Sequence, residues 1–315
     1  MMRTLGAGPR PFSRLAQQFF NEPLCILPHK AEVIACALQQ RLGIAKIDGI
    51  DGVTLDARAM MDRAATAADA ARDYRSGKSF HEKDGIAVIH IDGTLVHKYG
   101  WLDPVSGMTG YDGIAKKHRE AMRDQDIEAI WFDIDSPGGS TAGLFALCLQ
   151  IAAATKAEGG KPHYAYVNEQ ACSAAYAIAS VCDKVFGPED ACVGSIGCVI
   201  VHSDLTAALD KAGAEVTIIR AGERKYRGSA YEKLDKATMA KLQSAVDDTR
   251  RRFAEMVSIM RPITFEGVMA TEADWFEGRE AVQLGLMDEI LSEQEAWDRL
   301  EEEIDQIKRE RRQQQ

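Results

Sequence analysis

The chain has 315 residues, of which 46% are hydrophobic, so it can bury a sizeable core and form about two domains. Its formal net charge of −10 and pI near 5.3 argue against a nucleic-acid binder, which needs a positive surface. The seven cysteines are an odd number without paired metal-type spacing, which indicates free thiols in a reducing cytosol and predicts no metal site.

The N-terminal region shows no apolar signal core, and the small-residue run 171–182 is too short to cross a bilayer. We therefore expect a cytoplasmic protein without a membrane contact. Residues 1–80 are predicted to form an N-terminal extension that packs on the core. It would contain a short extended piece at 23–28 and helices at about 30–42 and 56–74.

From residue 85 the pattern changes to short β-branched or aromatic runs that alternate with helical patterns. The expected strands are 86–91, 129–134, 164–167 and 216–219. The expected helices are 111–124, 141–157, 173–182 and 203–212. This alternation predicts an α/β layered core over 81–291.

Two amphipathic helices are predicted near the C-terminus. The apolar positions between 234 and 260 fall on one side of a long helix, which would lie across the core or at a subunit contact. A capping box at Ser292 and Glu295 opens a C-terminal helical tail, 292–315, with Trp297, Leu300 and Ile304 on one face.

The candidate catalytic residues lie in three separate segments. Ser173 comes at the start of a small-residue helix, where N–H groups can stabilise an oxyanion. Gly138 and Gly139 close the strand 129–134 with a turn whose backbone N–H groups can also face an oxyanion. Lys225 follows at the interval that is typical of a serine-lysine peptidase.

Four ordered motifs carry a family resemblance: 133–140, 168–177, 193–197 and 271–279. Together they resemble the signal peptide peptidase A family of serine-lysine proteases, and more closely its bacteriophage branch of lambda-type prohead proteases. The resemblance covers roughly 85–291. It implies a Clp protease/crotonase-like ββα spiral core, oligomers in which neighbouring subunits complete the active groove, and no cofactor.

The resemblance also implies a role for each candidate residue. Ser173 would be the nucleophile and Lys225 the general base, with the amides of Gly138, Gly139 and Ala174 as the oxyanion hole. Ser195 would orient the lysine amine, although a structural turn serine is an alternative there. The implied partners are a capsid scaffold protein, this chain itself, and portal or capsid proteins inside a procapsid in the host cytoplasm.

Several alternatives remain open from the sequence. His202 or His163 could serve as the base of a Ser-His protease, and Cys172 is a rival nucleophile. A crotonase-like acyl-CoA enzyme would share the fold, and an inactive capsid scaffold would need no catalysis. Asp133 and Asp135 flank a strand end, where aspartates more often hold loops than bind a metal.

Overall fold

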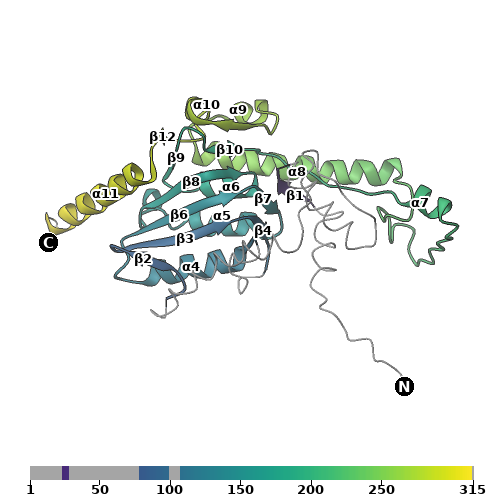
Figure 1. Ribbon diagram of the computed structural model, residues 1–315, viewed down its shortest axis with the longest axis horizontal. Helices are drawn as coiled ribbons and strands as arrows, with labels where there is room; N and C mark the ends of the chain where they lie inside the picture. The colour runs from purple at the N-terminus through teal and green to yellow at the C-terminus, as the bar shows by residue number, and fades with distance from the viewer. Residues whose placement is uncertain (1–22, 28–77, 99–106, 314–315) are drawn as a thin grey trace, which may run out of the picture.

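The computed structural model describes residues 23–27, 78–98 and 107–313. Two sheets form its framework (Figure 1). The larger sheet has the order β11-β10-β8-β6-β3-β2, with β9 beside β8 and β12 beside β9. Its strands are β2 (His81–Lys83), β3 (Ile86–Asp92), β6 (Ala129–Ser136), β8 (His163–Cys172), β9 (Lys184–Gly187), β10 (Cys192–Gly194), β11 (Trp275–Glu277) and β12 (Glu289–Ile290).

The central strands β3, β6, β8 and β10 run parallel to one another, whereas β2 and β11 pair antiparallel at the two edges. The smaller sheet has the order β1-β7-β4-β5. Its strands are β1 (Leu24–Ile26), β4 (Thr94–Val96), β5 (Met108–Gly110) and β7 (Gly138–Ser140). The short strands of the small sheet meet the large sheet where β6 ends.

Helices cover both faces of the large sheet, which explains why its strands read as continuous apolar runs. The helices are α4 (Tyr111–Arg123), α5 (Leu144–Ala152), α6 (Ala174–Ser180), α7 (Thr206–Lys211), α8 (Lys236–Met260), α9 (Phe265–Ala270), α10 (Gly278–Gln283) and α11 (Glu293–Gln313), with a 3-10 turn η3 (Lys156–Glu158). On β6, Ile130 and Phe132 face the core under α4, α5 and α6, whereas Trp131 faces α11.

The C-terminal helix α11 begins as the sequence predicts. The Ser292 N–H donates to Glu295 Oε2 at 2.9 Å, and the Glu295 N–H donates to Ser292 Oγ at 3.3 Å. The Ser292 hydroxyl also donates to Glu295 Oε2 at 2.6 Å. This bond, followed by the one from the Ser292 N–H, holds the pKa of Glu295 below its usual value, because both favour the carboxylate. Trp297 and Leu300 then bury one side of the helix against the sheet.

The α/β class and the Clp protease/crotonase type predicted for the core agree with this layered, mostly parallel arrangement. One predicted strand is wrong. Residues 216–219 form no strand, and the Ile219 side chain is 95% exposed, because no neighbouring strand or apolar surface of the described chain covers it. The predicted helices at 30–42 and 56–74 lie outside the described residues, and the boundaries at 80 and 291 stay predictions.

Candidate active site

Ser173 lies in the tight turn between β8 and α6. Its φ of 56° and ψ of −118° are unusual for a residue with a side chain, and such a conformation costs about 1–3 kcal/mol. The Ser173 N–H donates to the Gly194 carbonyl at 2.8 Å, which holds the turn against the neighbouring strand. The side chain is only 1% exposed. A serine held in a strained strand-to-helix turn matches the geometry of a nucleophile.

The glycine turn after β6 approaches this serine turn closely. Gly138 has a φ of 99°, and a Cβ added there would lie 3.0 Å from the Ala174 nitrogen and 2.9 Å from the Cys172 carbonyl oxygen. A Cβ at Gly139 would lie 2.0 Å from the Leu95 carbonyl oxygen. Only glycine therefore allows the two turns to meet, and their backbone N–H groups share one region.

The two glycine N–H groups have different partners. Gly138 donates to Ser136 Oγ at 3.2 Å, and Ser136 Oγ in turn donates to the Gly93 carbonyl at 2.6 Å. Gly139 pairs with Cys25 of β1. The Ala174 N–H belongs to the first turn of α6, where no intrahelical acceptor exists.

Ser195 lies next to Ser173 across two neighbouring strands, because each serine follows the end of its strand at the same position along the sheet. Strands β8 and β10 are parallel neighbours, and Cys172 pairs with Gly194. Each serine follows its strand directly and has a positive φ, 52° for Ser195. The Ser195 N–H donates to the Asp274 carbonyl at 2.8 Å, and the side chain is 7% exposed.

Lys225 is not part of this cluster within one chain. It is exposed and lies in the segment that joins α7 to α8. Figure 1 shows this segment beyond one end of the large sheet, at the opposite end of the molecule from α11. The expectation that a strand at 216–219 would lead Lys225 to the edge of the core fails with that strand.

The two histidine alternatives have different positions. His163 opens the ten-residue strand β8, whereas Ser173 follows its last residue, so about 30 Å of strand separates them. His163 Nε2 contacts His118 Nε2 at 2.9 Å inside the core, and burial lowers the pKa of His163. His163 therefore cannot act on Ser173 in its own chain. His202 lies half-buried in the segment after β10.

Two further candidate side chains, Asp133 and Cys172, have structural partners. Asp133 Oδ2 contacts His90 Nδ1 at 2.8 Å, and Asn168 also donates to Asp133. Cys172 Sγ lies 3.4 Å from Cys192 Sγ, and this hydrogen bond, followed by burial, raises the pKa of Cys172. Within the described residues, no group of three or more His, Cys, Asp or Glu side chains could hold a metal ion.

Sequence reasoning did not predict that Cys25 lies beside Ser173. The Cys25 thiol is fully buried and lies close enough to the Cys198 and Ser173 side chains for both to shift its pKa. The Cys198 side chain, followed by burial, raises the pKa of Cys25. The only sequence signal was a short apolar piece between two prolines, which indicates an extended strand but not its neighbours.

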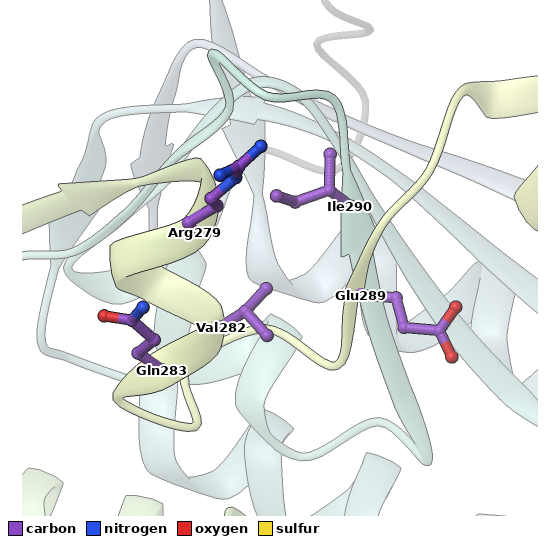
Figure 2. Close-up of a pocket in the computed structure, with 5 residues that line it drawn as sticks. All are labelled: Arg279, Val282, Gln283, Glu289 and Ile290. Carbon is purple, nitrogen blue, oxygen red and sulfur yellow. The ribbon is translucent and has the colours of Figure 1, made fainter.

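A cavity of about 370 Å³ lies between α10 and β12 and is lined by Arg279, Val282, Gln283, Glu289 and Ile290 (Figure 2). In Figure 2 the Glu289 side chain turns away from α10, and it pairs with Arg299 at 3.2 Å. The lining includes none of the predicted site residues and no nucleophile. This cavity is therefore separate from the Ser173 cluster.

Residues 155–306 match the model of Peptidase family S49. Capsid assembly protease C of Escherichia phage lambda is 37% identical over 288 residues, which are 91% of this chain and 65% of that protein. Head-tail preconnector protein GP5 of Enterobacteria phage P21 is 36% identical, over 91% of this chain and 56% of that protein. The chain thus spans about two thirds or less of the length of these relatives.

Residues 155–306 thus resemble a peptidase domain of family S49, and the predicted resemblance to phage capsid assembly proteases is confirmed. Among solved structures, a ClpP1 mutant from Listeria monocytogenes aligns with a TM-score of 0.40 and 14% identity. That alignment covers 66% of this chain and 92% of the other. None of the described helices combines the length and the apolar character that a membrane crossing requires.

Proposed function

We propose that this protein is a serine endopeptidase that uses Ser173 as its nucleophile and Lys225 as its general base. The observation that carries the proposal is the strained, buried position of Ser173 at the start of α6, directly against the Gly138 turn. Residues with strained backbone conformations of this kind cluster at active sites. The S49 domain match and the lambda-type relatives support a peptidase.

In the proposed reaction, the neutral lysine amine takes the proton from Ser173 Oγ as the oxygen attacks the scissile carbonyl carbon. The N–H groups of Gly139 and Ala174 stabilise the tetrahedral oxyanion. Gly138 supports them by allowing the close approach, and its own N–H contributes if it leaves Ser136 Oγ. Lys225 then protonates the leaving amine and activates a water that releases the acyl group. Ser195 orients the lysine amine.

A complete dyad in this proposal requires two copies of the chain. Lys225 lies on an exposed segment, so a neighbouring copy would deliver this lysine to Ser173. The N-terminal half of α8, where Met239 is 54% exposed, and the exposed Val216 and Ile219 supply apolar surface for such a contact. Burial at this contact would favour the neutral amine that base catalysis needs.

The proposed substrates are the capsid scaffold protein and this chain itself, with portal or capsid proteins as further partners. The names of the two phage relatives, a capsid assembly protease and a head-tail preconnector, support a role in procapsid maturation. Such a protease would act in the host cytoplasm, inside the procapsid.

The test is co-expression of the chain with the neighbouring virion proteins, followed by mass spectrometry of new termini. The Ser173→Ala variant is expressed in parallel. We expect new termini in the scaffold protein with the parent chain and none with the variant. Identical termini in both samples would show that another protease made them.

A further inference from the structure

Strand β1 is separated from the rest of its sheet by a long stretch of sequence, yet it lies directly on the glycine turn. Leu24 pairs with Ser140, Cys25 with Gly139 and Ile26 with Gly138, all antiparallel. All three β1 residues are buried. Of the residues before 78, the structure describes only 23–27, and these contact the candidate site.

The backbone of β1 is held on both sides. The Leu27 N–H donates to the Pro137 carbonyl at 3.0 Å. On the opposite side, the Leu24 N–H donates to the Val199 carbonyl and the Val199 N–H donates to the Leu24 carbonyl, both at 2.8 Å. An extended segment that lies between β7 and Val199 can therefore form backbone hydrogen bonds on both of its sides, as a bound peptide does when it adds a strand to a sheet.

The register brings the Cys25 carbonyl to the proposed oxyanion donors. In an antiparallel pair of strands, every second pair of opposite residues is hydrogen-bonded. Leu27 is hydrogen-bonded to Pro137, so the next hydrogen-bonded pair is Cys25 with Gly139, in which the Gly139 N–H donates to the Cys25 carbonyl. The Cys25 carbonyl oxygen and the Ala174 nitrogen both lie within 3.0 Å of the point where a Cβ on Gly138 would sit. Gly139 and Ala174 are the proposed oxyanion donors.

The side chain of Cys25 also faces the nucleophile. Its thiol is fully buried and lies next to the side chains of Ser173 and Cys198. The space that holds it therefore suits a small side chain. A peptide placed like β1 would present the carbonyl of its small residue to Ser173, with the next residue on the leaving side.

We propose that β1 occupies the peptide-substrate groove of its own chain, and that the protease is blocked until this strand leaves. The inference rests on the proposed function of Ser173. It also defines the substrate class: an extended peptide that runs antiparallel to β7, with a small uncharged side chain at the position of Cys25.

The experiment compares full-length variants that release β1. Leu24→Pro removes the N–H that donates to Val199, and Cys25→Trp cannot fit the space beside Ser173. Leu24→Ala keeps the N–H and should release the strand less, whereas Ile259→Ala changes an exposed residue at the C-terminal end of α8. Circular dichroism and urea midpoints identify the variants that fold, and either releasing variant alone suffices.

The first measurement is the rate at which a fluorophosphonate labels Ser173. We expect labelling to rise about fivefold or more in Leu24→Pro and Cys25→Trp, because a lost strand hydrogen bond corresponds to about this factor. Ile259→Ala should match the parent. Labelling of Ser173 that is measurable and equally fast in the parent and in the folded releasing variants would overturn the inference.

The second measurement does not need catalysis. A fluorescein-labelled peptide with the sequence of residues 22–28 is titrated into each variant in a Ser173→Ala background, and its anisotropy is followed. We expect binding only where β1 has been released. Peptide binding to the releasing variants, with no Ser173 labelling in any chain, would reject the proposed nucleophile but retain the blocked groove. Equal peptide binding to parent and releasing variants would reject the blocked groove.

Discussion

Ser173 and Ser195 leave two adjacent parallel strands at the same level, because Cys172 and Gly194, the residues before them, are paired across β8 and β10. Both serines have a positive φ, and the Ser173 N–H donates to the Gly194 carbonyl. This relationship places a second serine next to the candidate nucleophile along the backbone, although Ser195 lies in a different sequence motif.

Removing either member of the proposed dyad should abolish scaffold cleavage to a similar extent. Ser173→Ala, Lys225→Ala and Lys225→Arg should each lower the cleavage rate by at least about a thousandfold, because nucleophile and base act as one unit and a guanidinium keeps its proton. Cleavage is measured on gels with purified scaffold protein. Arg224→Ala, which changes the neighbouring exposed residue, should leave cleavage near the parent level. An active Lys225→Ala beside an inactive His202→Ala would establish a histidine base instead.

Two inactive variants should complement each other when mixed. If Lys225 reaches Ser173 of a neighbouring copy, an equal mixture of Ser173→Ala and Lys225→Ala subunits that exchange should recover about a quarter of the parent activity. Half of the sites in this mixture keep Ser173, and half of their neighbours supply Lys225. Light scattering should show a dimer or larger assembly. A monomer that still cleaves would contradict this arrangement, as would subunit exchange without recovery.

The rival nucleophile Cys172 should be dispensable. Its hydrogen bond with Cys192 and its burial raise its pKa, so the thiol stays protonated and unreactive at neutral pH. Cys172→Ala should therefore keep most of the cleavage activity. Iodoacetamide should inhibit the parent and Cys172→Ala equally. Loss of cleavage in a folded Cys172→Ala protein, together with an active Ser173→Ala protein, would identify Cys172 as the nucleophile in place of Ser173.

The buried pair His118 and His163 should make folding sensitive to acid. Burial, with the neighbouring His163, lowers the pKa of His118 to about 3 from its usual 6.5. The unfolded chain binds the proton more tightly, so this contribution to stability is complete above pH 6.5 and is lost as the pH falls from about 6.5 to about 3.

Urea unfolding at several pH values measures this effect. A folded His118→Gln variant should show a smaller loss of unfolding free energy across this pH range than the parent, while the exposed His81→Gln variant should follow the parent. An identical pH dependence of the parent and His118→Gln would contradict the assignment.

Helix α11 should contribute to the stability of the core. The Trp297 ring lies 5.2 Å from the Trp131 ring, and Lys83 Nζ lies 4.3 Å from its centroid. Trp297→Ala should lower the free energy of unfolding by about 3 kcal/mol, as large-to-small core substitutions do. The exposed neighbour Asp298→Ala should change it by less than about 0.5 kcal/mol in the same urea titration. Equal values for the two variants would show that α11 is not anchored at Trp297.

Sequence patterns by themselves determined most of the local structure. The apolar runs around Ile89 and Phe132 predicted buried strands because both faces of a parallel sheet are covered. The Ser292 capping box predicted the start of α11, and the small residues after Ser173 predicted a closely packed helix. These features depend on neighbours along the chain, so sequence periodicity contains them.

Only the tertiary structure decided how distant segments meet. The run at 216–219 has strand-forming residues, but a strand needs a partner, and the described chain supplies none there. The place of Cys25 beside Ser173 depends on backbone hydrogen bonds to Gly139 and Val199, which carry no side-chain pattern. Strand pairing between remote segments is set by backbone geometry and burial, and a single sequence does not record which edge a short strand will join.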